Sequence, residues 1–205
     1  MLTAVARMLL WPFARICIPD ARIDPRKDAG VIIAANHRSL LDIFVGLVAF
    51  RRWRVRPGVL IRGDYFDHRL LGPVLRAIGG IPAGRGYGAQ AMTSAREVLR
   101  AGGVLVLAPE GRITHGGERT DGIADLKPGV GRLSAELGSP ILLVGLSNSD
   151  RVWPLGARLP RLPRPFCQRP TVRLRTEWLV MPEGSDPAEI LVSVSRGLSQ
   201  LLQER

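Results

Sequence analysis

The sequence predicts an α/β fold: a single layered domain with a largely parallel central sheet flanked by helices, preceded by an N-terminal amphipathic helix. Two observations lead to this prediction. Short apolar runs rich in β-branched residues alternate along the chain with longer segments of helical periodicity, an order typical of parallel sheets. The chain has 205 residues, of which 46% are hydrophobic, so it is long enough to bury one core.

Residues 1–20 are expected to form the amphipathic helix, and residues 21–205 the folded domain. On a helical projection one face carries apolar side chains, namely Leu2, Val5, Leu9, Phe13 and Ile16. Arg7 and Arg15 lie roughly opposite, Pro12 would kink the helix, and no apolar run approaches the ~20 residues that span a bilayer. The pattern leaves two interpretations open, a helix in the plane of a membrane or one that packs on the domain.

Strands are expected wherever a short apolar run is bounded by polar or turn residues. These runs cover residues 31–35, 58–62, 104–107, 141–144 and 171–180, the last of them near a sheet edge. Helical periodicity predicts helices at residues 40–51, 67–78, 90–100 and 129–137, and a final amphipathic helix from residue 186. A polar, glycine-rich loop is expected over 109–127, and an irregular surface segment rich in Pro and Arg over 151–170.

The formal net charge of +11 comes almost entirely from arginine, since Lys27 and Lys127 are the only lysines. A bias toward arginine codons, attraction to anionic lipids or phosphates, and nucleic-acid binding would each produce this excess. The run from Arg51 to Arg56, with Trp53 inside it, fits a lipid interface, a nucleic-acid surface or a solvated helix end. The cysteines, Cys17 and Cys167, form no metal or disulfide pattern, and fit a reducing cytosolic compartment.

The segment from Asn36 to Asp42 carries the strongest functional pattern. It follows the first expected strand, and ligands of parallel sheets bind beyond the carboxyl ends of the strands. His37 is a candidate general base, because an imidazole has an unperturbed pKa of ~6.5. Asp42 could orient its ring if Asp42 lies in the first turn of the following helix. Ser39 and Asp42 also match the S-x-x-D capping pattern, so spacing alone leaves both roles of Asp42 open.

Several blocks of the chain resemble one family in order and spacing. Asn36-His37-Arg38-Ser39-Leu40-Leu41-Asp42 is similar to the NHxxxxD motif of the glycerolipid acyltransferase family, which includes the 1-acylglycerol-3-phosphate acyltransferases. The later family blocks are matched by Gly79–Arg85, Ala108–Arg112, Lys127–Gly129 and Ser139–Val144. The third block departs from the family's FPEGTR, because Arg112 stands one position earlier, and the form PEGRIT is similar to members that reacylate 2-acyl-lysophosphatidylethanolamine. In the last block Leu143 replaces the family's proline.

The resemblance implies a role for each matching residue. His37 and Asp42 would be the catalytic pair, with His37 deprotonating the acceptor hydroxyl for direct attack on a thioester. The acceptor phosphate would be bound by a set of residues from the second and third blocks, namely Arg85, Glu110, Gly111 and Arg112. Glu110 could instead anchor its loop, orient an arginine or serve only as a turn residue.

The resemblance implies that residues 21–205 are an acyltransferase domain of the 1-acylglycerol-3-phosphate O-acyltransferase type. The enzyme would take a fatty acyl group from acyl-CoA or acyl-carrier protein, in phospholipid biosynthesis, with no metal and no further cofactor. Reacylation of 2-acyl-lysophosphatidylethanolamine and acylation of glycerol-3-phosphate are the alternative reactions. The expected partners are the lysophospholipid, the acyl thioester and a membrane surface, with no nucleic acid, and the expected location is peripheral, on the cytoplasmic face of a membrane.

Two functions of other classes compete with acyl transfer. A hydrolase of thioesters or lipids would use water as its acceptor, and a non-enzymatic basic module would bind membranes or nucleic acid through salt-sensitive contacts that do not depend on His37.

Overall fold

The computed structural model describes residues 8, 10–23, 30–114, 117, 122–163 and 168–203. The strands are β1 (Arg15–Cys17), β2 (Val31–Ala35), β3 (Gly58–Arg62), β4 (Gly80–Ala83), β5 (Val104–Leu107), β6 (Ile141–Ser147) and β7 (Thr171–Leu179). The helices are α2 (Leu41–Arg52), the 3-10 helix η1 (Gly63–Phe66), α3 (Leu71–Ala77), α4 (Gly88–Arg100), α5 (Gly129–Leu137), α6 (Ser149–Val152) and α7 (Pro187–Gln203). The bounds expected for β2, β3, β5 and α5 are confirmed to the residue.

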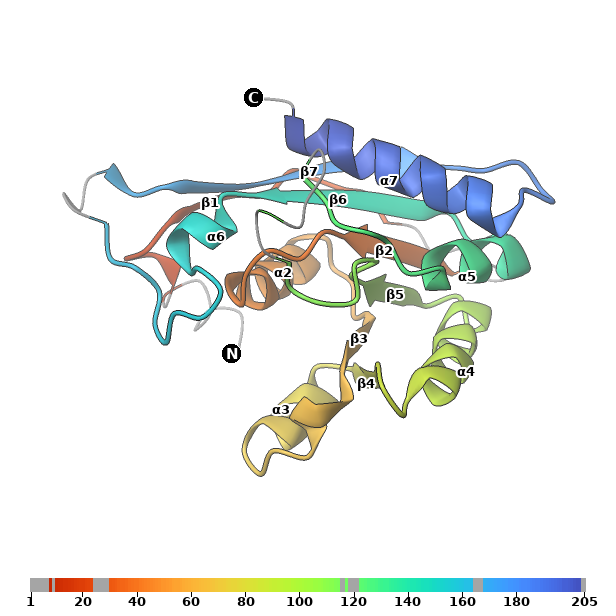
Figure 1. The fold of residues 1–205 in the computed structure, drawn as a ribbon, viewed down its shortest axis with the longest axis horizontal. Helices are drawn as coiled ribbons and strands as arrows, with labels where there is room; N and C mark the ends of the chain where they lie inside the picture. The colour runs from red at the N-terminus through yellow and green to blue at the C-terminus, as the bar shows by residue number, and fades with distance from the viewer. Residues whose placement is uncertain are drawn as a thin grey trace.

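These strands form one seven-stranded sheet in the described part of the chain, in the order β1-β7-β6-β2-β5-β3-β4 (Figure 1). Neighbouring strands run parallel except for β6 and β7, which are antiparallel. The predicted α/β fold with a largely parallel sheet is therefore confirmed. β7 lies next to the edge strand β1, so its expected place near an edge is confirmed as well.

The core lies on both faces of the sheet, with the central strand β2 dividing it. Val31 and Ile33 point into the cluster that contains the buried face of α2, whereas Ile32 and Ala34 point into the cluster formed with α4, α5 and α7. Side chains alternate between the faces of a strand, and a strand covered on both sides is apolar throughout. Figure 1 shows α7 and α5 on one side of the sheet and α2 on the other.

The helix expected at the N-terminus does not extend to its predicted end. Arg15–Cys17 form β1, which pairs with β7 from Arg15 opposite Thr171 to Cys17 opposite Arg173, so Ile16 lies in a strand. Residues 11–13 form a turn, in which the amides of Phe13 and Ala14 both donate to the Leu10 carbonyl. Pro12 cannot donate a backbone hydrogen bond, and beyond it the chain pairs with a free sheet edge. Leu2, Val5, Arg7 and Leu9 lie outside the described residues.

The segment between β3 and β5 differs most from the prediction. The helix expected over 67–78 is shorter in the structure, because α3 begins only at Leu71, and the 3-10 helix η1 lies before the predicted range. Pro73 stands in the first turn of α3, where a missing amide proton is tolerated. The pattern also did not predict β4, because Gly80 and Pro82 are poor strand residues. β4 is the edge strand, a position where proline is compatible with a sheet. This unit of β3, η1, α3 and β4 forms the lower arm of the molecule in Figure 1.

Trp53 lies in the interior rather than at an interface with solvent or lipid. Only 6% of the residue is exposed, and its indole N–H donates to the carbonyl of Pro19 at 2.9 Å. The side chain thus ties the end of α2 to the segment that follows β1. The interpretation of Trp53 as an interfacial aromatic is wrong, because helix periodicity turns it inward while its arginine neighbours Arg51, Arg52 and Arg54 stay exposed. Among the described residues no helix is long and apolar enough to cross a bilayer.

Candidate active site

His37 leaves the sheet at the carboxyl end of β2, at a point fixed by its neighbour Asn36. The Asn36 side chain is buried, and its amide donates to the carbonyl of Leu146 at 3.1 Å while the Leu146 amide donates back to Asn36 Oδ1 at 2.6 Å. Both polar ends of this side chain are thereby bound to β6, the strand beside β2. The backbone that carries His37 therefore has a fixed exit from the sheet.

The His37 ring meets the carboxylate of Asp42. The distance from His37 Nδ1 to Asp42 Oδ2 is 2.9 Å, with 23% of the histidine side chain and 7% of the aspartate side chain exposed. Asp42 lies in the first turn of α2, so the chain folds back between the two residues. Because Asp42 occupies Nδ1, the other ring nitrogen, Nε2, remains for proton transfer with a bound hydroxyl.

The same carboxylate oxygen also caps the start of α2. Asp42 Oδ2 accepts hydrogen bonds from the backbone amides of Arg38 at 2.7 Å and Ser39 at 2.9 Å. Ser39 Oγ in turn accepts from the Leu41 amide at 3.1 Å and donates to the Trp153 carbonyl at 2.6 Å. Asp42 therefore combines the two roles that its spacing left open, since satisfying the helix start holds its carboxylate where His37 meets it.

Glu110 connects the loop after β5 to the backbone of His37. Its carboxylate is buried, with Oε1 accepting from the His37 amide at 3.2 Å and Oε2 from the hydroxyl of Thr114. The Thr114 amide donates to the His37 carbonyl at 3.3 Å, so the loop is bound to both the backbone amide and the backbone carbonyl of His37. A buried carboxylate with these partners is suited to anchoring the loop, whereas its charge would repel a phosphate.

Gly111 and Arg112 follow at the exposed turn of this loop. Gly111 has a φ of 72°, a conformation that glycine adopts without strain, and its amide donates to the Ala108 carbonyl at 2.9 Å. Lys127 runs alongside, with its amide donating to the Pro109 carbonyl at 2.7 Å. Arg112 is exposed beside this turn. The turn thus presents one arginine at the sheet edge where His37 emerges.

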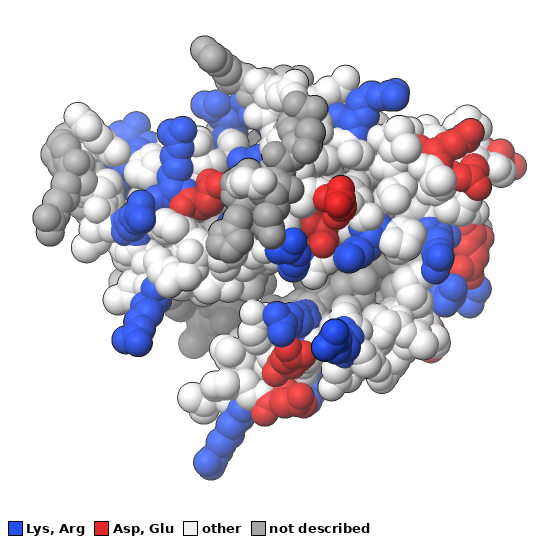
Figure 2. Space-filling view, viewed as in Figure 1, with Lys and Arg blue, Asp and Glu red and all other residues white. Residues whose placement is uncertain are grey.

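Arg85 lies farther along the same sheet edge. It is exposed two residues beyond β4, a strand that parallels β3 and β5 and lies three places from β2 in the sheet, or roughly 14 Å at the usual strand spacing. The structure therefore brings His37, Asp42, Glu110 and Gly111 into one connected loop system, and leaves Arg85 on the neighbouring arm. Figure 2 shows basic side chains on both sides of a hollow between this arm and the rest of the molecule.

Comparison with known proteins agrees with this geometry. The sequence profile of the acyltransferase family matches residues 20–147, more than half of the chain.

The chain belongs to the acyltransferase family.

The crystal structure of the 1-acyl-sn-glycerophosphate (LPA) acyltransferase PlsC from Thermotoga maritima is similar in fold. The TM-score is 0.69 at 21% sequence identity, and the match covers 100% of this chain and 79% of that one. No sequence among the curated proteins matches the chain significantly. At this level of identity the similarity to the PlsC structure establishes only the fold of this chain. Membership of the acyltransferase family rests on the match to the family profile.

Sequence reasoning gave no role to several residues that position the site of this acyltransferase. Thr114 is 1% exposed, and Arg38 donates through Nη2 to the Gly122 carbonyl at 2.7 Å, tying the segment that carries His37 to the end of the long loop. Their position inside or next to the matched blocks was the available signal. Arg62 lies beside Ala83 in the sheet register, two residues before Arg85. Its hydrogen bond to Asp64 holds the pKa of that carboxyl below the usual value.

The described residues offer no cluster of three or more His, Cys, Asp or Glu side chains that could hold a metal ion. The groups that converge at this edge of the sheet are instead an imidazole, its carboxylate partner and an arginine-bearing turn. Such an arrangement can remove a proton from a hydroxyl and attract an anionic substrate.

Proposed function

We propose that this acyltransferase transfers a fatty acyl group from a thioester to the hydroxyl of 1-acylglycerol-3-phosphate, working peripherally at the cytoplasmic face of a membrane. The observation that carries the proposal is the 2.9 Å contact between His37 Nδ1 and Asp42 Oδ2, at the end of the sheet where the ring remains partly exposed. The resemblance of the blocks around it, and the fold shared with a PlsC enzyme, support a lysophosphatidate acceptor.

The reaction is a direct transfer between donor and acceptor. His37 Nε2 takes the proton of the acceptor hydroxyl as its oxygen attacks the thioester carbonyl carbon. The new C–O bond forms, the C–S bond breaks, and the thiolate leaves with the proton that the imidazolium returns. Asp42 stabilises the imidazolium between these steps, and its capping bonds keep the carboxylate in place.

The acceptor phosphate is assigned to the arginines at this edge of the sheet. Arg112 lies on the turn that Glu110 ties to His37, and Arg85 lies on the arm beyond it. A guanidinium binds phosphate through paired, charge-assisted hydrogen bonds. Glu110 is given the anchoring role, because its carboxylate is buried and bonded to His37 and Thr114.

The test offers labelled acyl-CoA with a panel of acceptors and identifies the products by mass. Lysophosphatidate is expected to be acylated fastest, and His37→Ala is expected to abolish transfer while the fold persists. The sequence PEGRIT makes 2-acyl-lysophosphatidylethanolamine the second acceptor to measure, with glycerol-3-phosphate as the third. Release of free fatty acid without any acceptor would identify a hydrolase, and an active His37→Ala enzyme would end the proposal. Replacing acyl-CoA by acyl-carrier protein in the same assay identifies the donor.

A further inference from the structure

A cleft lies at the far end of α2 from the catalytic pair. It opens between the carboxyl end of α2 and the end of α3, with a volume of about 1000 Å³. Its lining from α2 runs from Leu47 to Arg51, roughly 8 to 14 Å from Asp42 along the helix axis, and Asp42 itself does not line it. The cleft is thus distinct from the edge of the sheet where His37 and Glu110 meet.

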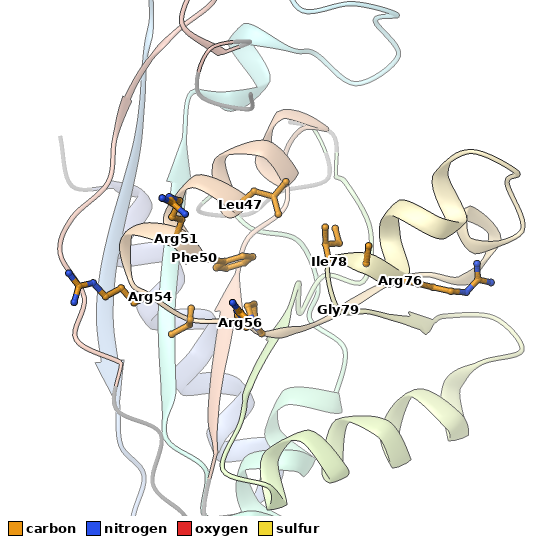
Figure 3. A pocket seen from close by; sticks show the side chains of 11 residues that line it. Leu47, Phe50, Arg51, Arg54, Arg56, Arg76, Ile78 and Gly79 are labelled. Atoms are coloured by element: carbon orange, nitrogen blue, oxygen red, sulfur yellow. The ribbon is translucent and has the colours of Figure 1, made fainter. Parts of the chain in front are cut away.

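The centre of the cleft is apolar. Leu47 and Phe50 from α2 face Ile78, which follows α3, across the gap between the helices (Figure 3). The apolar surface continues along the outside of α3, where Val74 and Leu71 are exposed one and two turns before Ile78, respectively. Exposed apolar patches of this kind mark sites of contact with membranes or proteins.

Every charged residue that lines the cleft is an arginine: Arg51, Arg54, Arg56 and Arg76. All four are exposed. In Figure 3 the guanidinium groups of Arg51, Arg54 and Arg76 point outward around the apolar centre rather than toward one another. An apolar centre with a cationic rim matches the interface of an anionic bilayer, whose charged headgroups surround an apolar interior.

The backbone at Arg54 points to a role for its side chain. Helix α2 ends in a Schellman motif, in which the Val55 amide donates to the Phe50 carbonyl at 2.9 Å and the Arg54 amide to the Arg51 carbonyl at 3.2 Å. Arg54 occupies the left-handed position of this motif, with a φ of 58°, where glycine is normally found. An arginine here is unfavourable for the backbone, so the fold does not account for it.

We infer that this cleft is the surface through which the acyltransferase docks on a membrane, with its arginines on the phosphates of anionic phospholipids and its apolar centre toward the acyl chains. The inference rests on the proposed function in one respect, namely that a lysolipid acceptor is supplied by a bilayer. It assigns membrane contact to residues of the folded domain, in addition to any contact made by residues 1–20.

The test measures co-sedimentation with vesicles of phosphatidylcholine alone and of phosphatidylcholine with phosphatidylglycerol. The triple variant Arg51→Gln/Arg54→Gly/Arg56→Gln is compared with Arg132→Gln/Arg173→Gln/Arg196→Gln, which removes the same charge from α5, β7 and α7. Each arginine at an anionic surface contributes about fivefold, so the cleft variant is expected to bind roughly a hundredfold more weakly. The control variant should bind nearly as wild type. Equal losses of vesicle binding in both variants would show that binding depends on net charge alone, and would overturn the inference.

Two further variants separate binding from folding. Arg54→Gly should lower vesicle binding about fivefold while its thermal midpoint stays within about 3 °C of wild type, because glycine suits the backbone. Leu71→Ser/Val74→Ser should weaken binding even at ~0.5 M salt, where the charge contribution is screened. Unchanged binding in either arm contradicts the docking surface.

The readout is independent of the reaction. His37→Ala should bind vesicles as wild type does, and the cleft variant should keep its kcat with a short-chain, monomeric acceptor in solution. If the wild type transfers no acyl group, the vesicle data still decide the inference. The cleft variant could instead bind vesicles normally and lose only kcat/KM with acyl-carrier protein, or only DNA binding in a gel shift. Either outcome would show that the cleft binds an acidic macromolecule, and would overturn the membrane inference.

Discussion

At the scale of single residues, the candidate active site depends on carboxylates that each serve two purposes. Asp42 Oδ2 accepts from His37 and from the amides of Arg38 and Ser39, so the group that orients the imidazole also begins the helix. Glu110 similarly accepts from the His37 amide and the Thr114 hydroxyl. Because these bonds share acceptors, a substitution at either carboxylate changes both local structure and chemistry, and the choice of substitution decides which effect dominates.

Asp42→Asn is expected to reduce kcat by roughly 10³-fold or more while KM changes little. The amide oxygen can still accept from the Arg38 or Ser39 amide, but a neutral group no longer stabilises the imidazolium, an effect of about this size in enzymes that pair a carboxylate with histidine. Steady-state kinetics give both constants. The double variant with His37→Ala should be no slower than His37→Ala alone, because the two residues act as a unit; additive losses would contradict the pairing.

Glu110→Ala is expected to destabilise the fold by about 2–3 kcal/mol, since it leaves the part-buried His37 amide and the buried Thr114 hydroxyl without their acceptor. Urea unfolding measures the loss. Glu110→Gln keeps an acceptor of the same size and should recover most of the stability. If Glu110→Ala kept full stability and only raised KM for the phosphate-bearing acceptor, Glu110 would belong to the substrate site instead of the loop anchor.

At the scale of elements, close contacts between helices and neighbouring backbone limit which side chains are possible. The α5–α7 contact brings Gly131 so near to Pro187 that an added Cβ would lie 2.2 Å from the Pro187 carbonyl oxygen. Gly46 in α2 has open surroundings by comparison, since its added Cβ would lie 3.5 Å from the Phe50 ring. Both glycines lie inside helices, where alanine is intrinsically the better residue.

The same substitution to alanine is expected to change the free energy of unfolding in opposite directions at these two positions. Gly46→Ala should stabilise the protein by about 0.5–1 kcal/mol, because the helix gains and the contact is ordinary. Gly131→Ala should destabilise it by about 1–3 kcal/mol, because α5 and α7 must move apart. Chemical denaturation of the two variants side by side is the measurement. Stabilisation by Gly131→Ala would mean that the α5–α7 contact is looser than the structure has it.

At the scale of the whole molecule, a net charge of +11 on 205 residues makes the folded state repel itself. Some arginines are paired, as where Arg96 and Arg100 both contact Glu136, but these pairs are partly exposed and contribute little. The arginines of the cleft between α2 and α3 line a surface with no acidic residue among its lining. Self-repulsion should therefore outweigh the exposed pairs.

Raising the salt concentration should stabilise the protein. Between ~0.01 M and ~0.15 M the Debye length falls from about 30 Å to about 8 Å, which screens repulsion between distant arginines first. The thermal midpoint is expected to rise by a few degrees, as measured by calorimetry in sodium chloride. Sodium sulfate is unsuitable, because it also strengthens apolar burial. A midpoint that falls with salt would show that ion pairs such as Arg96–Glu136 contribute more than the repulsion.

The sequence by itself determined the layered α/β fold, most element bounds and the pairing of His37 with Asp42, because these follow from local patterns: apolar runs, helical periodicity and a motif contained in seven consecutive residues from Asn36 to Asp42. It could not determine β1 and β4, short strands formed only because β7 and β3 offer free edges. Nor could it place Trp53 in the core, or give Asp42 and Glu110 their shared hydrogen bonds. Such contacts join residues far apart in the chain, as between Glu110 and His37, and only the packed sheet brings them within bonding distance.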